Sequence, residues 1–316
     1  MSVTTRPTAP VARAGRRRLR GRKWTRQLGD YAFVAPAAVF IGIFALYPIY
    51  YAITGSFHNV TLSTLLTGTE NFVGFGNYRQ IFSDPSFTSA VQITVVFVAL
   101  TVVIQFVIAF GFALLFNMRF PLSRFLRATV LIPFVLPTIV TGTIFTWILQ
   151  KQTGVFNYLL TSIGVIRSPI GWLSDTTAAL ISVIIASVWL SVPFYMSLLL
   201  AGLQAIPPTL YEAASVDGAN AWQKFWRITL PQMRGPVLIT LVLGVIFTSN
   251  AFDVIYIMTA GGPLNATTTL PIYAYKAAFE TFNYGTAFAT TTLIFLVLLL
   301  VGALYIWLNR HEAVGE

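Results

Sequence analysis

The residues best suited to chemistry in this chain form a short polar stretch at positions 212–219, with the sequence Glu-Ala-Ala-Ser-Val-Asp-Gly-Ala. Glu212 and Asp217 supply carboxylates, which pair with the guanidinium groups of other proteins. The small pair Ala213 and Ala214 lets another protein approach the backbone closely. This combination indicates a docking surface. Within the long apolar segments on either side, no His, Asp or Glu cluster and no nucleophile is arranged for catalysis.

The residues around this stretch predict a helix that presents it. The helix starts at Pro207-Pro208-Thr209, because proline is tolerated in a first helical turn, where its missing N–H has no partner anyway. Leu210, Ala213 and Ala214 then lie at positions i, i+3 and i+4 on one face. Gly218 ends the helix at a position that requires a positive φ.

A second helix follows directly. Asn220 is suited to cap its N-terminus. Trp222, Phe225 and Trp226 repeat the i, i+3, i+4 spacing on one face. Pro231 is expected to stop this helix. Residues 205–231 thus predict a helix–turn–helix with small residues on its first face and aromatic residues on its second.

Two interpretations of this helix–turn–helix compete. It could dock into a groove of another protein, or it could lie on the membrane as an interfacial amphipathic hairpin. The second interpretation favours a polar face rich in Lys and Arg. The polar face of the first helix carries Glu212 and Asp217 instead. The acidic face favours docking.

Composition places the chain in a membrane. Of 316 residues, 56% are hydrophobic and 9% are charged, and the mean hydropathy is +0.75. Soluble domains carry about 25% charged residues. With no cysteine, disulfides, thiolate metal sites and cysteine nucleophiles are excluded. Histidine occurs only at His58 and His311, which gives no basis for a haem or histidine metal site.

The net charge of +10 does not indicate nucleic-acid binding, because its distribution follows a membrane pattern. Nine of the twenty Lys and Arg residues precede residue 30 and stop where the first apolar segment begins. The positive-inside rule makes such a cluster a cytoplasmic anchor that contacts anionic headgroups. No nucleic-acid partner is expected.

Six apolar segments are long enough to cross a bilayer, which requires about 20 residues of helix. They are roughly 31–54, 90–116, 126–149, 177–203, 235–260 and 286–308. With the N-terminus inside, sixteen Lys and Arg residues lie on the cytoplasmic side and four outside. The sequence predicts an all-α integral membrane protein with six transmembrane helices, both termini in the cytoplasm, and the helix–turn–helix between the fourth and fifth spans. Its expected parts are a basic tail at 1–30, a membrane domain at 31–309 and a tail at 310–316.

Further motifs accompany the polar stretch in order along the chain. They are Tyr47-Pro48, Gly76-Asn77-Tyr78, Asp84-Pro85, Leu131-Ile132-Pro133, Trp189 and Thr259-Ala260-Gly261-Gly262-Pro263. Together with Glu-Ala-Ala, the following Gly and Ile-x-Leu-Pro at 228–231, they resemble the carbohydrate-type permease subunits of ABC importers. Within that family the chain is similar to the first permease of maltose- and glycerol-phosphate-type transporters. The resemblance covers about residues 30–310, without the extra N-terminal spans and large external domain of the maltose-type member.

The resemblance implies half of a pore in a bacterial or archaeal plasma membrane. The implied partners are a second, similar permease, a dimer of ATPase subunits and an extracytoplasmic solute-binding protein. The chain has no Gly-x-x-x-x-Gly-Lys-Ser/Thr loop, so ATP and Mg are expected on the ATPase subunits, with no cofactor in this chain and no catalysis by it. The residues expected to couple to the ATPase are Glu212, Ala213, Ala214, Asp217 and Gly218.

The resemblance also implies where substrate is held. The matching positions are Ser187, Leu190, Ser191 and Phe194 in the fourth span and Gly244, Phe247, Thr248 and Ala251 in the fifth. Each set falls on one helical face. An aromatic ring beside hydroxyl groups suits a sugar. Maltose-type members carry asparagine where this chain has Ser187, Thr248 and Ala251, which predicts a substrate other than maltose.

Two residues of the fifth span stand out independently of the resemblance. Asn250 and Asp253 are strongly polar, and such groups within spans are functional by default. Asp253 could instead lie at the external end. Ser, Thr and Gly in the spans could also serve close helix packing alone.

The expected substrate is a neutral sugar, oligosaccharide or polyol, because no Lys or Arg lies in the interior of spans two to six. A non-sugar solute such as glycerol phosphate remains the alternative. A stand-alone ion-coupled transporter is a rival from another class. It predicts transport by this chain without any ATPase, and the chain lacks the matched pair of Gly/Pro-broken spans that marks many such transporters.

Overall fold

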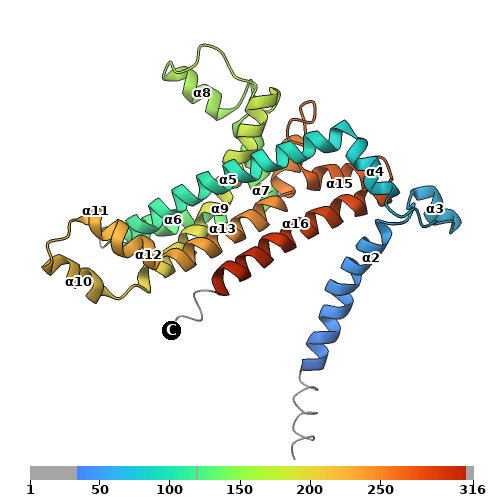
Figure 1. The fold of residues 1–316 in the computed structure, drawn as a ribbon. Coiled ribbons are helices and arrows are strands. Elements are labelled where there is room, and N and C mark those ends of the chain that lie inside the picture. Colours follow the sequence, from blue (N-terminus) through green and yellow to red (C-terminus); the bar gives the residue numbers. More distant parts are fainter. Residues whose placement is uncertain (1–33, 119, 311–316) are drawn as a thin grey trace, which may run out of the picture. The chain divides into compact units, whose positions relative to one another are not determined.

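The computed structural model describes residues 34–118 and 120–310 (Figure 1). The predicted basic tail at 1–30 and residues 311–316 of the predicted C-terminal tail lie outside the described residues. The chain divides into two compact units, Met1–Tyr51 and Ala52–Glu316, and each is described by itself. Extended pairing in the described residues amounts to two isolated bridges, His58 with Phe72 and Thr61 with Asn283, so the fold is all-helical as predicted.

The described helices follow one another with short connections. Their bounds are η1 Gly42–Leu46, α2 Tyr47–Gly55, α3 Leu62–Thr67, α4 Gly76–Ser83, α5 Pro85–Asn117, α6 Ser123–Val135, α7 Thr138–Ile148, α8 Val155–Ser162, α9 Thr176–Gln204, α10 Pro208–Val216, α11 Ala221–Lys224, η2 Phe225–Thr229, α12 Leu230–Gln232, α13 Arg234–Ser249, α14 Asp253–Thr259, α15 Leu270–Phe279 and α16 Tyr284–Arg310. The two η elements are π-helical turns within longer helices.

Within residues 34–118 and 120–310, four helices are long and apolar enough to cross a membrane unbroken. The first is Val34–Gly55, which contains η1 and α2, and the others are α5, α9 and the part of α16 from Tyr284 to Trp307. They coincide with four of the predicted segments to within a few residues. The polar residues at their starts explain where two of them begin. The Asp84 carboxylate accepts the Ser86 N–H before α5, and that of Asp175 accepts the Ala178 N–H before α9.

Asp84 also ties a non-spanning helix to the start of α5. The Tyr273 hydroxyl of α15 donates to the Asp84 carboxylate across 2.7 Å. Burial raises the pKa of Tyr273 above its ordinary value, and the hydrogen bond to Asp84 adds to the shift. The phenol therefore stays protonated and keeps donating throughout the physiological pH range.

The third predicted segment, 126–149, is not one straight helix. It is divided into α6 and α7, whose axes are bent by 101°. The break lies at Leu136-Pro137, where Leu136 is extended with ψ of 135°. The proline ring pushes the residue before it out of the helical region. The hydrophobic pattern does not record this effect, so it predicted one continuous helix where the structure has two.

The fifth predicted segment, 235–260, is broken as well. Helix α13 ends at Ser249, three residues follow, and α14 begins at Asp253. At the break, the Asn250 amide donates to the Ile246 carbonyl across 2.8 Å. Such local side-chain bonds offer the backbone an alternative to the helical ladder. The break matters for the site described below.

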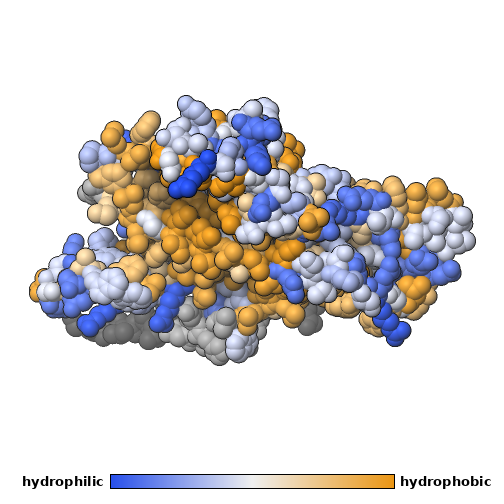
Figure 2. All heavy atoms as spheres, turned by 90° about the horizontal axis from the view of Figure 1, so that it is seen from above, coloured by the Kyte–Doolittle hydropathy of each residue, from blue (hydrophilic) through white to orange (hydrophobic). Residues whose placement is uncertain are grey.

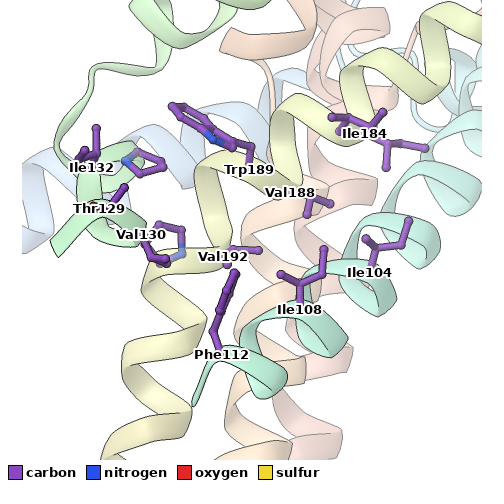
Figure 3. A pocket seen from close by; sticks show the side chains of 13 residues that line it. Ile104, Ile108, Phe112, Thr129, Val130, Ile132, Ile184, Val188, Trp189 and Val192 are labelled. Carbon is purple, nitrogen blue, oxygen red and sulfur yellow. The ribbon is translucent and has the colours of Figure 1, made fainter. Parts of the chain in front are cut away.

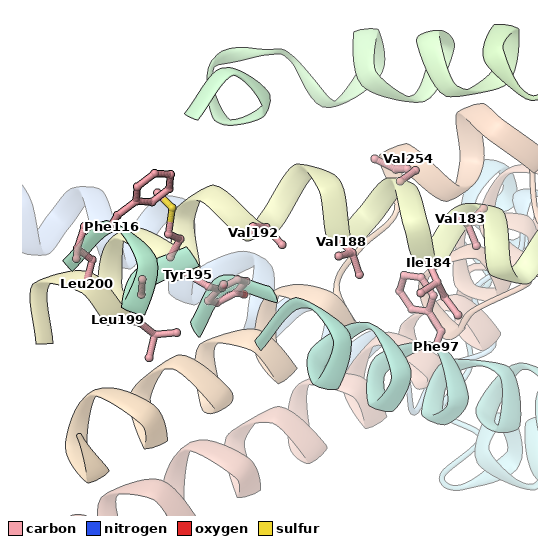
Figure 4. Packing of buried hydrophobic residues seen from close by; sticks show 14 of the residues in the cluster. Phe97, Phe116, Val183, Ile184, Val188, Val192, Tyr195, Leu199, Leu200 and Val254 are labelled. Carbon is pink, nitrogen blue, oxygen red and sulfur yellow. The ribbon is translucent and has the colours of Figure 1, made fainter. Parts of the chain in front are cut away.

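The core of the second unit lies along α5 and α9, which pack side by side (Figure 4). Phe97 of α5 and Val183, Tyr195 and Leu199 of α9 are buried there, and Val254 adds α14 to the same cluster. The fully buried Ala109 and Ala113 bring the two helices close, as small residues do in membrane bundles.

Apolar side chains also cover much of the outside of this unit. They fill the middle of the face seen in Figure 2, with hydrophilic residues gathered around it. On α5, Val103 and Val107 are 59% and 62% exposed. Such extensive apolar surface requires lipid or a partner to cover it.

Candidate functional site

The predicted helix–turn–helix is present with the expected local structure. Helix α10 starts with Pro208 in its first turn and ends before Gly218, whose φ is +76°. Asn220 caps α11 and forms a capping box with Gln223. The prediction of both helices, the turn glycine and the cap is confirmed.

Pro231, however, does not stop the second helix, and that prediction is wrong. The helix passes through the π-turn η2 and continues as α12 to Gln232. In the π-turn the Leu230 N–H donates to the Phe225 carbonyl, five residues back, and Met233 resumes an ordinary bond to Thr229. The missing N–H of Pro231 falls where the ladder is already shifted, so little is lost there.

The two helices are fixed to each other by polar contacts. The hydroxyls of Tyr211 and Thr229 are 2.9 Å apart, and the Lys224 ammonium donates to the Ser215 hydroxyl across 2.7 Å. Glu212, Ala213 and Asp217 are exposed. Residues 205–231, called the elbow below, are thus held together by these contacts and present their acidic and small residues outward.

The aromatic residues of the second helix form a cluster beside this surface. Trp222 and Trp226 make an edge contact with ring centroids 5.4 Å apart, and Phe225 contacts both. Trp222 is 69% exposed and Val216, at the end of α10, is 88% exposed. Large apolar side chains that are exposed together in this way mark a surface that another protein or lipid covers.

A second feature is a cavity of about 220 Å³ between α5, α9 and the break in the fifth span. Seven of the nine residues predicted to hold substrate line it: Ser187, Leu190, Ser191, Phe247, Thr248, Asn250 and Ala251. Two helices far apart in the sequence therefore bring their predicted faces together at one place.

The other two predicted residues, Phe194 and Gly244, are not among the cavity's lining residues. Phe194 packs against Phe247 with ring centroids 6.0 Å apart and against Phe134 at 6.3 Å. At Gly244 a Cβ atom would lie 3.0 Å from the Gln105 amide nitrogen. Phe194 supports a lining ring, and Gly244 leaves room for the Gln105 side chain.

The sequence reasoning missed six lining residues of the cavity, and Gln105 is the most polar of them; the others are Thr101, Thr138, Tyr195, Phe252 and Val254. Gln105 lies in the middle of α5, is 2% exposed, and lines the cavity with Thr101 and Tyr195. The Ser191 hydroxyl donates to its side-chain carbonyl across 2.6 Å and bonds the Ser187 carbonyl at 2.8 Å. An amide within an otherwise apolar span was the signal that could have revealed it.

The break in the fifth span completes the cavity wall. Asn250, Ala251 and Phe252 form the break and all line the cavity. Non-helical backbone inside a membrane is tolerated only where it is buried in protein or lines a water-filled cavity. Beside it, Asp253 is exposed and its carboxylate accepts from the Thr138 hydroxyl across 3.1 Å. The cavity therefore combines hydroxyls, two amides, a carboxylate and aromatic rings.

A larger groove of about 570 Å³ between α5, α6 and α9 has different chemistry (Figure 3). Its lining is apolar, with Ile104, Ile108 and Phe112 on α5 and Val188 and Trp189 on α9, and Thr129 is its one hydroxyl residue. Such a lining offers few hydrogen bonds to a polar solute. The smaller cavity is the candidate substrate site.

Residues 105–313 match the family model described as the binding-protein-dependent transport system inner membrane component. The chain belongs to this family. The match includes the elbow and most of the cavity lining. A membrane component of such a system forms the pore, and ATP is hydrolysed by separate subunits, so this permease is not an enzyme.

Curated relatives match the sequence of this permease along nearly their whole length. The permease is 34% identical to the trehalose/maltose transport system permease protein MalF of Thermococcus litoralis, over 89% of this chain and 94% of the relative. It is 33% identical to the sulfoquinovosyl glycerol transport system permease protein SmoG of Agrobacterium fabrum, over 92% and 95%. It is 33% identical to the lactose transport system permease protein LacF of Rhizobium radiobacter, over 90% and 94%.

A solved structure shows the same fold. A chain in the crystal structure of a bacterial alginate ABC transporter, in complex with an alginate pentasaccharide-bound periplasmic protein, is 22% identical to this permease. The two match with a TM-score of 0.79 over 92% of this chain and 97% of the other. The permease therefore has an ABC transporter permease fold and resides in a membrane.

Proposed function

We propose that this permease is half of the pore of an ATP-driven, binding-protein-dependent importer for a neutral sugar, oligosaccharide or polyol. The observation that carries the proposal is the cavity between α5, α9 and the span break. Ser187, Ser191 and Thr248 offer hydroxyls and Gln105 and Asn250 offer amides, next to the ring of Phe247. Sugars need this combination, because their hydroxyls require hydrogen bonds while their C–H faces pack on aromatic rings.

Two further observations bear on the substrate: the names of the relatives support a carbohydrate, and the charge of the cavity lining favours a neutral one. The names of the curated relatives above describe them as permeases for trehalose and maltose, for sulfoquinovosyl glycerol, and for lactose. No Lys or Arg is among the lining residues of the cavity, and Asp253 is the one charged lining residue. An anion such as glycerol phosphate, the alternative substrate, would need a cation supplied by another subunit.

The proposed mechanism is alternating access driven from the elbow at 205–231. In it, ATPase subunits grip Glu212, Ala213, Ala214, Asp217 and Gly218, and their movement switches the side to which the cavity opens. The proposed complex holds a second permease, an ATPase dimer and an extracytoplasmic solute-binding protein. ATP and Mg are bound by the ATPase subunits, and this chain needs no cofactor of its own.

An uptake assay tests this function directly. Proteoliposomes that contain the permease, its second permease and the ATPase subunits, with solute-binding protein outside, should accumulate radiolabelled neutral carbohydrate only when ATP is inside. The same vesicles with ADP are the control. Preferential uptake of glycerol phosphate would support the alternative substrate. Uptake by this chain alone under an ion gradient would contradict the proposal.

The proposed topology has six spans, which are Val34–Gly55, α5, α6 with α7, α9, α13 with α14, and α16. The domain bounds remain 1–30 for the basic tail, 31–309 for the membrane domain and 310–316 for the C-terminal tail. We propose that both termini and the elbow lie in the cytoplasm of a bacterial or archaeal cell, as the distribution of Lys and Arg indicates.

Single cysteines test this topology. The chain has no cysteine, so Thr67→Cys and Ala219→Cys can be labelled in it without background. Thr67 ends the short helix α3 and Ala219 lies in the turn of the elbow. In intact cells, an impermeant thiol reagent should label Thr67→Cys and not Ala219→Cys. Both should react after the membrane is permeabilised. The reverse pattern in intact cells would contradict the six-span topology.

A further inference from the structure

A third pocket, distinct from the substrate cavity, lies where α5 and α9 end. Its volume is about 810 Å³, and the N-terminal half of α6 and the start of α10 complete its wall. The polar lining residues are Asn117, Ser123, Arg124, Arg127, Gln204 and Tyr211. The proposed mechanism of transport uses none of them.

The two arginines give this pocket a positive charge that its own lining does not neutralise. Arg127 donates from Nη2 to the Phe116 carbonyl across 2.9 Å, and its Cζ atom lies 5.7 Å from the centre of the Phe116 ring. Its Nε atom is buried without a hydrogen-bond partner among the described residues. None of the residues that line the pocket is Asp or Glu. A guanidinium with a buried free donor calls for an acceptor, and an anionic oxygen is the strongest one.

Large apolar side chains adjoin the pocket in the connection from α5 to α6. Met118, which lines it, is 66% exposed, and Leu122 and Phe125 are 73% and 68% exposed. Leu122 also has a positive φ of 65°, a conformation that leucine rarely adopts. Exposed apolar groups at the end of membrane helices, next to arginines, match the two parts of a phospholipid, acyl chains and headgroup.

We propose that this pocket binds the phosphate headgroup of an anionic phospholipid. Arg124 and Arg127 contact the phosphate oxygens, with the Arg127 Nε among the donors, and the acyl chains lie against Met118, Leu122 and Phe125. Basic pockets between transmembrane helices bind lipid headgroups in this way. The site does not depend on which solute the permease transports.

The pocket adjoins the elbow, so a lipid bound in it would contact the elbow directly. Pro208 and Tyr211 of α10 line the pocket, and the Tyr211 hydroxyl contacts Thr229 of the second elbow helix. A bound headgroup therefore touches the same helix that presents Glu212. A lipid bound in the pocket should stabilise the conformation of the elbow. ATP hydrolysis by the complex should therefore be higher in membranes with anionic lipid.

Lipid binding to the purified complete complex tests the site. Native mass spectrometry would follow titration with palmitoyl-oleoyl phosphatidylglycerol, with the matching phosphatidylcholine as the neutral probe. The anionic phosphatidylglycerol should bind more tightly than the neutral phosphatidylcholine. A single Lys or Arg near anionic lipid contributes about fivefold to binding, so Arg124→Gln should weaken this lipid about fivefold and the Arg124→Gln/Arg127→Gln pair about thirtyfold.

Arg234→Gln is the matched control, because it removes one exposed positive charge at the start of α13, outside the pocket. This variant should bind phosphatidylglycerol about as tightly as the unmodified complex does. Equal binding of the two lipids, or an equal loss with Arg234→Gln, would overturn the proposal. Displacement of the lipid by millimolar inorganic phosphate would show a site for soluble anions instead. Loss of the ATPase subunits from Arg124→Gln with lipid binding unchanged would assign the arginines to a protein contact.

Discussion

Replacing Gly218 by valine should weaken the association of the permease with its ATPase subunits and lower substrate-stimulated ATP hydrolysis. Gly218 has a φ of +76° in the turn of the elbow, and nothing lies within 4 Å of where its Cβ would be. The cost of valine is therefore in the backbone rather than in a clash, and a left-handed conformation costs about 1–2 kcal/mol for an L-residue. A turn that relaxes to negative φ changes the angle between α10 and α11, and with it the placement of Glu212. Binding to the ATPase should weaken about five- to thirtyfold.

Gly218→Asn is the matched control, because asparagine tolerates the left-handed conformation and should keep most of the activity. Glu212→Ala removes the charge and leaves the turn intact, so it should weaken ATPase association without changing the elbow. Substrate-stimulated ATP hydrolysis and the amount of ATPase that copurifies would be measured for all three. Normal assembly and hydrolysis with Gly218→Val would show that the elbow is not the coupling element.

Removing one hydrogen-bonding group from the cavity should reduce transport and leave assembly unchanged. Thr248→Val keeps the size of the side chain and removes a hydroxyl that lines the cavity. Gln105→Leu removes the acceptor of the Ser191 hydroxyl as well as a group that can bind substrate. A buried polar group without a partner costs about 1–3 kcal/mol, so uptake at limiting substrate should fall roughly 5- to 100-fold in each variant.

Thr292→Val is the control for these substitutions, because the Thr292 hydroxyl in α16 is buried with no hydrogen-bond partner among the described residues, and Thr292 does not line the cavity. Uptake per purified complex decides the interpretation. If Gln105 and Thr248 serve helix packing alone, the variants lower the yield of complex, and uptake per complex stays near normal. Unchanged uptake per complex in both cavity variants would leave Asn250 as the better candidate for substrate binding.

The elbow could be predicted from the sequence because its signals are local. A proline in a first turn, a glycine that must take a positive φ, and an Asn cap each act within four residues, so Pro208, Gly218 and Asn220 placed the helices correctly. Pro231 was misjudged because the π-turn before it removes the usual conflict with the helical ladder, and that turn has no local sequence signal.

Four of the six predicted segments, which are long helices in the structure, also followed from the sequence, since hydrophobic length is a property of one segment at a time. The resemblance to the permease family pointed to the faces of α9 and α13. The cavity is different, because Gln105, Ser191 and Thr248 come from three helices that tertiary packing alone brings together. Only the structure decided that Gln105 turns toward Ser191, that Phe194 lies behind Phe247, and that the chain breaks at 250–252 to form a wall. The physical reason is that a membrane tolerates a broken helix only where neighbouring helices or water satisfy its backbone, and no single segment records which neighbours those are.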